Sequence, residues 1–475
     1  MRAIKKLTIC IAIATLLFSN NVSIFAAGKT IEAYKNNTYS GISDCEVMIN
    51  GVKSQVSSYT STFKNKNSNP GITQSDFTGK AKAIKYWASH GSNSGALWGD
   101  SGVSFNIMNI NNFKWSGSNL EFVFLAACNQ LDGANKNPRA KYANAMIGNN
   151  AVRVICGYHE SAPPADENHD AAVATNFIAK AKTGESVKSS WIQANQIYGS
   201  ANYCVLTHSG NVQYSRFEGF PGLTYSRPGS SSTTILRFSA ANPGGINQPL
   251  SSGESSFSSL MQGLDIPDYS IKATETTISV VPTAQTTVLK LDNYLTTQNG
   301  EIGDEEIKIS EEQALSRAKV WVEDVFDGIT WSDYEDAELT ILPIVMAEVD
   351  LDGNVENEKE VCVAYDISLK SKFNGIPIFD DKYCAIVDDS GVVSSAISHR
   401  NYEIIKDNDI KEKLKKEDIE KKFSSQDIDL GVIEDLTVAF MDDDGDGIFD
   451  PVVSVKTADG RTTNFNIISN KMSVY

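Results

Sequence analysis

The sequence predicts a parallel α/β domain over residues 28–225, followed after a linker by an α+β domain with an antiparallel sheet. Short apolar runs at 83–89, 122–127 and 151–158 alternate with helical segments, as is typical of strands buried on both faces of a parallel sheet. Beyond residue 265, Thr/Val/Ile-rich strands follow one another with few helices between them. The 475 residues are enough for a separate core in each part.

The first 27 residues are expected to be a secretory signal peptide. Basic Arg2, Lys5 and Lys6 precede an apolar run at 7–18, and residues 24–27 end in small side chains suited to cleavage. This run is too short to span a bilayer comfortably, and no second one follows. We therefore expect a secreted, extracellular protein with no integral membrane segment in the mature chain.

The remaining elements follow from periodicity and end signals. Helices are predicted in the first domain at 137–147, 166–182 and 186–198, and in the second at 308–326 and 410–422. Antiparallel strands are predicted at 339–349, 361–368, 383–387 and 392–398. Residues 226–265 are rich in Ser, Gly and Pro, a composition typical of a linker.

The distribution of charge also divides the chain, near residue 230. Residues 1–230 carry a net charge of +8 and the remainder a net charge of −25. Either the acidic part is kept soluble by its charge, or the two parts attract each other. The first part has no concentrated basic stripe, which argues against a nucleic-acid partner.

Six cysteines remain after signal removal, too few for a disulfide scaffold, and none forms a Cys-x-x-Cys pair. Most are interpreted as small buried side chains. Cys362 and Cys384 flank a predicted hairpin at Asn374-Gly375 and could form a bridge.

Two of the apolar runs end on a histidine and a cysteine. AIKYWASHGS at 83–92 reaches His90 and Gly91, and EFVFLAACNQ at 121–130 reaches Cys128. Alone, such a cysteine is usually a packing residue and such a histidine an ordinary loop residue. Together, at the carboxyl ends of parallel strands, they indicate a nucleophile and a proton-transfer group sharing one substrate.

These motifs resemble the caspase-like cysteine peptidases of clan CD, which include clostripain, gingipain, legumain, separase and the CHAT-domain peptidases. The resemblance covers roughly residues 75–200 and implies a three-layer α/β/α fold and endopeptidase activity on a protein or peptide substrate. It implies that Cys128 is the nucleophile and His90 the general acid/base, with the N–H groups of Gly91 and Cys128 forming the oxyanion hole. The alternative is a secreted binding or surface-interaction protein that reuses the fold without catalysis.

The sequence departs from part of this family two residues before the nucleophile. Ala126 stands where metacaspases and legumain have an acidic residue, so their substrate-pocket logic does not transfer. Specificity for Arg or Lys would need another acid, and the candidates are Asp100, Glu160 and Asp166. His159 ends the next apolar run and could line the same cleft.

The acidic part has two further features. FNGIPIFDDKYCAIVDDSGVV at 373–393, with the helix before it, resembles PepSY-type and thermolysin-propeptide-type modules, which implies an intramolecular inhibitor. MDDDGDGIFDPVV at 441–453 places Asp442, Asp444 and Asp446 at every second position, followed by Gly447, which permits a sharp turn, and Asp450, a spacing that suits a structural Ca²⁺ site. The candidate ligands are Asp442, Asp444, Asp446, the carbonyl of Ile448 and Asp450, and the alternative is an uncoordinated acidic turn. No organic cofactor is expected.

Overall fold

The computed structural model describes residues 28–474 except 37–42, 66, 68–70, 80–82, 100–104, 116–118, 134–135, 149–150, 164–168, 199–201, 223–233, 241–266, 268, 275–278, 281–286, 292–293, 328, 335–336, 399–400, 406–432, 442–447, 458–461 and 467–471. The predicted signal peptide and the predicted helix at 410–422 lie outside these residues.

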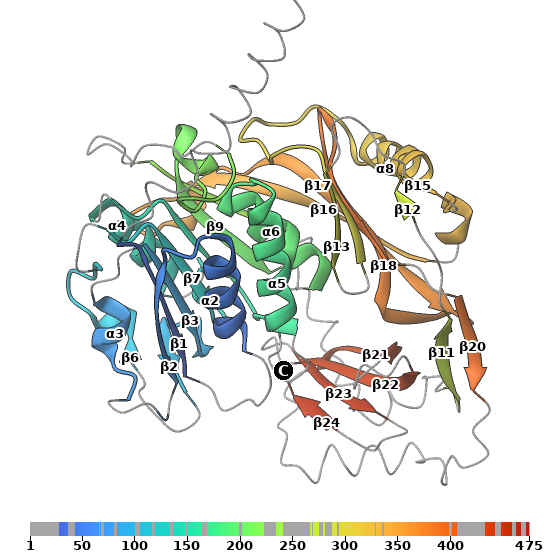
Figure 1. Ribbon diagram of the computed structural model, residues 1–475, viewed down its shortest axis with the longest axis horizontal. Helices are drawn as coiled ribbons and strands as arrows, with labels where there is room; N and C mark the ends of the chain where they lie inside the picture. Colours follow the sequence, from blue (N-terminus) through green and yellow to red (C-terminus); the bar gives the residue numbers. More distant parts are fainter. Residues whose placement is uncertain are drawn as a thin grey trace, which may run out of the picture.

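A parallel sheet forms the first part of the chain (Figure 1). Its hydrogen-bonded order is β2 (Thr60–Asn65), β1 (Thr30–Lys35), β3 (Ile84–Ala88), β7 (Phe122–Ala126) and β8 (Val154–Tyr158). The antiparallel strands β9 (Tyr203–His208) and β10 (Ile235–Ala240) extend it beyond β8. The front of the chain is therefore α/β with a mainly parallel sheet.

The same sheet continues into the acidic part. Its order after β10 is β16 (Glu338–Glu348), β17 (Val361–Phe373), β18 (Ile376–Asp388), β19 (Gly391–Ile397), β14 (Tyr294–Gln298) and β13 (Thr287–Leu291), all antiparallel. The predicted antiparallel strands of the acidic part are confirmed. The protein is mixed α/β with one large mixed sheet.

Smaller elements complete the described chain. The helices are α2 (Asp44–Gln55), α3 (Gln74–Thr78), α4 (Pro138–Gly148), α5 (His169–Lys182), α6 (Val187–Tyr198) and α8 (Glu311–Val325), with 3-10 turns η1 (Ile107–Asn109), η2 (Gly210–Tyr214), η3 (Trp331–Tyr334) and η4 (Val355–Asn357). The short strands are β4 (His90–Gly91), β5 (Ala96–Trp98), β6 (Phe105–Asn106), β12 (Ser279–Val280) and β15 (Phe326–Asp327). The last strands are β11 (Ser270–Thr274), β20 (Asn401–Ile405), β21 (Ile433–Met441), β22 (Ile448–Thr457), β23 (Thr462–Asn466) and β24 (Met472–Val474).

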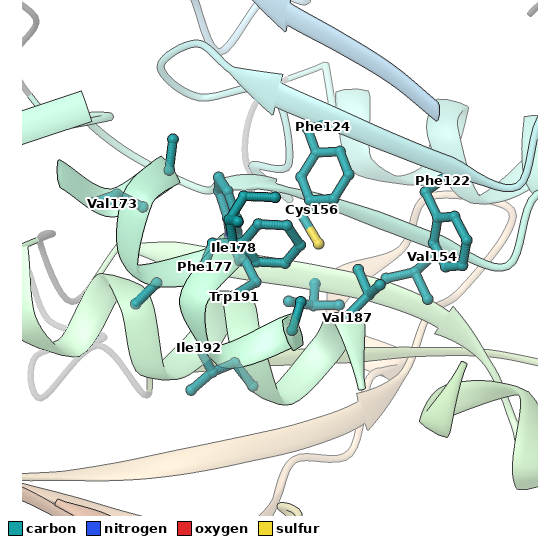
Figure 2. Packing of buried hydrophobic residues seen from close by; sticks show 14 of the residues in the cluster. Phe122, Phe124, Val154, Cys156, Val173, Phe177, Ile178, Val187, Trp191 and Ile192 are labelled. Atoms are coloured by element: carbon teal, nitrogen blue, oxygen red, sulfur yellow. The ribbon is translucent and has the colours of Figure 1, made fainter. Parts of the chain in front are cut away.

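Strand β7 shows why the parallel strands are apolar throughout. Phe122 and Phe124 point into a core formed with α2, α5 and α6, and Figure 2 shows them with Cys156, Phe177 and Trp191. The alternate residues of β7 pack into a second core that includes side chains of α4. Because side chains alternate across a strand, burial on both faces requires a continuous apolar run.

The expected linker at 226–265 is wrong at residues 235–240, which form strand β10. All six residues are buried, and β10 pairs with β9 on one side and β16 on the other. Arg237 accounts for part of the error, because a charged residue in a short segment weakens the apolar pattern of a strand. Its guanidinium is compensated by Glu358 and Glu360 of the acidic part.

The junction between the two parts is polar and partly buried. Arg139 in α4 contacts Glu358 at 2.7 Å, and the two side chains are 8% and 2% exposed. Asn137 donates to the carbonyl of Gly353 at 2.9 Å, and Gln196 in α6 donates to Asp366 in β17 at 2.7 Å. The acidic part is thus joined to the front part through the shared sheet and through side chains on both faces.

All six cysteines of the described chain are free thiols. The bridge considered between Cys362 and Cys384 is absent because Cys384 lies opposite Ser368, whereas Cys362 lies opposite Val345 on another strand. Among the described residues, no helix has the length and apolar character needed to cross a membrane.

Candidate active site

The structure brings the ends of β3 and β7 together in register. The two strands are parallel neighbours, and Ala88 lies opposite Ala126. His90 and Cys128 each follow two residues later. The N–H of Ser89 donates to the carbonyl of Ala126 at 3.2 Å, so the pairing continues toward both residues. The predicted pair therefore lies at the carboxyl ends of adjacent parallel strands.

His90 begins a small hairpin, residues 90–98, which we call the His90 hairpin. Strand β4 pairs antiparallel with β5, placing His90 opposite Trp98. The two rings are stacked, with centroids 5.8 Å apart and an interplanar angle of 30°. The imidazole is half-buried and has an indole on one side. This contact limits the orientations available to the histidine ring.

Cys128 lies in the segment 127–133 between β7 and α4, which we call the nucleophile loop. The N–H of Ala162 donates to its Sγ at 3.3 Å. Burial raises the pKa of the Cys128 thiol, and the backbone N–H donors at Ala162 and Cys128 oppose this rise only in part. Burial therefore disfavours the thiolate, and a neighbouring base would be needed to activate the thiol.

The nucleophile loop is held to the end of β8. The N–H of Asn129 donates to the carbonyl of Glu160 at 2.7 Å, and the N–H of Leu131 donates to the carbonyl of Tyr158 at 2.9 Å. Asn129 has φ 59°, a left-handed conformation that asparagine tolerates better than most residues. This turn places Cys128 between the ends of β3 and β8.

Gly91 has a steric reason to be glycine. A Cβ at this position would lie 2.1 Å from the carbonyl oxygen of Cys128 and 3.0 Å from its nitrogen. The backbones of residues 91 and 128 are thus in close contact. Both predicted oxyanion donors come from this pair of segments.

Two of the predicted pocket residues, Asp100 and Asp166, lie outside the described residues. His159 and Glu160 follow β8 and are half-buried. His159 lines a cavity of about 180 Å³ at the junction of the two parts, together with Asp132, Gly133, Arg139, Arg237, Ser239, Ala240, Val355, Glu358 and Glu360. Asp132, which lies in the nucleophile loop four residues after Cys128, lines this cavity, and the acidic part contributes Val355, Glu358 and Glu360.

The predicted Ca²⁺ ligands Asp442, Asp444 and Asp446 also lie outside the described residues. Ile448 and Asp450 are described at the start of β22. Asp450 Oδ1 accepts a hydrogen bond from Ser270 at 2.6 Å, and its Oδ2 accepts one from Asn466 at 3.2 Å. Within the described part of the chain, no group of three or more His, Cys, Asp or Glu residues is arranged to hold a metal ion.

Three residues at the site were not predicted from the sequence: Trp98, Gln130 and Ala162. Gln130 stands only two positions after Cys128, so its proximity was visible, but its partners in the His90 hairpin were not. Ala162 contacts the thiol through its backbone, which leaves no signature in the residue type.

Comparison with known proteins shows that one family model matches the segment containing the candidate site. Residues 33–217 match the family model described as a domain of unknown function (DUF6345). The match runs from β1 past β9 and includes both His90 and Cys128. No curated protein matches the chain.

Proposed function

We propose that this protein is a secreted cysteine endopeptidase of the caspase-like type, with His90 and Cys128 as its catalytic dyad. One observation carries the proposal: the two residues stand at equivalent positions beyond adjacent parallel strands. The covering of β7 by helices on both faces is consistent with a caspase-like three-layer arrangement. Secretion and the structural Ca²⁺ loop at 442–450 are further parts of this proposal.

In the proposed reaction, His90 takes the proton of the Cys128 thiol as the sulfur attacks the scissile carbonyl carbon. The new C–S bond forms a tetrahedral oxyanion, which the N–H groups of Gly91 and Cys128 stabilise. His90 then transfers its proton to the leaving amine as the C–N bond breaks. Water attacks the remaining thioester with His90 as base, releasing the acid and restoring the thiol.

The test is hydrolysis of a peptide library by the mature chain. Cys128→Ala and His90→Ala are each expected to abolish hydrolysis without lowering the melting temperature substantially. Cys362→Ala is the matched control, because among the six cysteines that the structure describes Cys362 is the other one that is not fully buried. An inactive wild type, or a Cys128→Ala variant as active as wild type, would reject the proposal.

The raised pKa of Cys128 favours one alternative, a secreted binding protein whose thiol stays protonated and unreactive. The rate of thiol alkylation distinguishes the proposed peptidase from this binding protein. An activated Cys128 should be alkylated near neutral pH faster than Cys362, and this advantage should disappear in His90→Ala. Equal slow alkylation of both cysteines would favour the binding protein.

We further propose that the acidic part restrains the peptidase, in line with its PepSY-like resemblance. Support comes from Val355 and Glu358, which line the cavity that adjoins the nucleophile loop. Ending the chain near residue 228 would be a poor test because it would also delete the buried strand β10. A protease site inserted within 241–266 keeps every described strand. Cleavage there, or high salt, should raise activity if the acidic part inhibits.

A further inference from the structure

Gln130 is a fully buried side chain within the nucleophile loop. Its Nε2 donates to the carbonyl oxygens of Ala96 at 3.0 Å, Cys128 at 3.3 Å and Ser92 at 3.4 Å. Ser92 and Ala96 belong to the His90 hairpin, whereas Cys128 is the candidate nucleophile. One amide group therefore links the segment that carries the candidate base to the segment that carries the thiol.

The orientation of this amide is fixed from its other side. The hydroxyl of Tyr142 in α4 donates to Gln130 Oε1 at 3.0 Å. Tyr142 is itself fully buried and stacks on Trp115, with ring centroids 6.1 Å apart. Carbonyl oxygens can only accept hydrogen bonds, so a reversed amide would lose all three of its contacts with them. Gln130 is thus anchored to α4 while its Nε2 spans both catalytic segments.

The space around this contact is closed. A Cβ at residue 91 would lie 2.9 Å from Gln130 Nε2, as well as 2.1 Å from the carbonyl oxygen of Cys128. Residue 91, the nucleophile loop and the amide are therefore packed against one another. Any change in the amide is expected to alter the separation between the His90 hairpin and Cys128.

We propose that Gln130 is the positioning residue of this site: its amide holds the His90 hairpin against the nucleophile loop so that the imidazole and the thiol stay in register. The inference rests on the proposed peptidase function for its catalytic consequence. The mechanical link itself stands on the hydrogen bonds of Nε2 and does not depend on activity.

Gln130→Met tests the proposal because it removes the donor at nearly constant volume. The matched control is Gln196→Met, which removes another buried amide, the one that donates to Asp366 at 2.7 Å from α6. Hydrogen exchange of a peptide covering residues 90–98 reports the hairpin, with residues 203–208 of β9 as the internal reference. Alkylation of Cys128 as a function of pH reports its coupling to His90.

Gln130→Met should speed exchange of the His90 hairpin, leave β9 unchanged and lower kcat/KM by about 100-fold, with most of the effect on kcat. The pH profile of Cys128 alkylation in Gln130→Met should shift to that of His90→Ala, and the double variant Gln130→Met/His90→Ala should show no further shift. Gln196→Met should lower the melting temperature without these changes. If Gln130→Met does not fold, Gln130→Glu replaces it, with partial recovery expected at low pH, where the protonated carboxyl is again a donor.

Unchanged exchange of the His90 hairpin in a folded Gln130 variant would overturn the inference. A wild-type alkylation profile combined with the same loss of melting temperature as Gln196→Met would also overturn it, because that pattern describes a purely structural amide. Faster hairpin exchange in Gln130→Met, together with a wild type that hydrolyses no peptide, would support the link and reject the proposed function.

Discussion

Replacing Glu358 by glutamine is expected to destabilise the junction between the two parts of the chain. Glu358 is 2% exposed, and its Oε2 lies 2.7 Å from Arg139 Nη2 and 3.4 Å from Arg237 Nε. The two guanidiniums are also buried, at 8% and 7% exposure. Glutamine keeps the shape of the side chain but removes the charge that compensates them.

The magnitude follows from what the substitution leaves behind. Removing one partner of a buried ion pair costs about 3–5 kcal/mol, since the remaining charge stays away from water. Glu360→Gln is the matched control, because Glu360 also pairs with Arg237 but is 49% exposed. An exposed pair contributes about 0–1 kcal/mol, so the control should change stability little.

The assay is urea unfolding followed by tryptophan fluorescence, comparing midpoints at unchanged slope. Glu358→Gln should unfold at a clearly lower urea concentration than Glu360→Gln. The double variant Arg139→Met/Glu358→Met should recover the part of the loss that comes from Arg139, because apolar replacement of a buried pair is often neutral, whereas Arg237 still lacks Glu358. Equal midpoints for Glu358→Gln and Glu360→Gln would refute the reasoning. Peptidase activity in the same variants would rise if the acidic part inhibits and fall if the cavity serves the substrate.

Three more predictions concern the site, the junction and the metal loop. Gly91→Ala should abolish peptide hydrolysis and cost about 1–3 kcal/mol of stability, because its Cβ would lie 2.1 Å from the Cys128 carbonyl oxygen. Burial raises the pKa of Asp366 to about 6. The free energy of unfolding is therefore highest below about pH 4, where the carboxyl is protonated in both folded and unfolded protein, and falls as pH rises through 6. Asp366→Asn should stabilise the protein by up to about 3 kcal/mol at pH 7 and by little at pH 4. Millimolar Ca²⁺ should raise the melting temperature, and Asp442→Asn should remove this effect.

Each of these predictions has its own check. Gly148→Ala is the control for Gly91→Ala, since its Cβ would have no neighbour within 4 Å, and equal effects of the two would contradict the steric argument. For Asp366, urea midpoints measured from pH 4 to 7 should converge at the acid end, and a constant difference would contradict the titration. For calcium, Asp352→Asn in another acidic turn is the control, and a shift that survives Asp442→Asn would place the ion elsewhere.

The sequence by itself predicted the elements whose signals are local. Apolar runs identified β3, β7 and β8, and the helices at α4, α5, α6 and α8 were located within a few residues. The positions of His90 and Cys128 just beyond β3 and β7 were predictable for the same reason, because each residue follows a continuous run of buried apolar residues. The antiparallel strands of the acidic part could also be predicted, from their β-branched composition.

Only the tertiary structure decided how these elements meet. Strand β10 was missed because Arg237 interrupts its apolar pattern and is compensated by Glu358 and Glu360, more than 100 positions away. The union of both parts in one sheet follows from that strand. The role of Gln130 was likewise hidden, since a glutamine carries no local signal, and its carbonyl partners in the His90 hairpin lie more than 30 positions earlier. Local composition determines whether a segment is buried, whereas the partner of a buried polar group depends on which distant segments the fold places beside it.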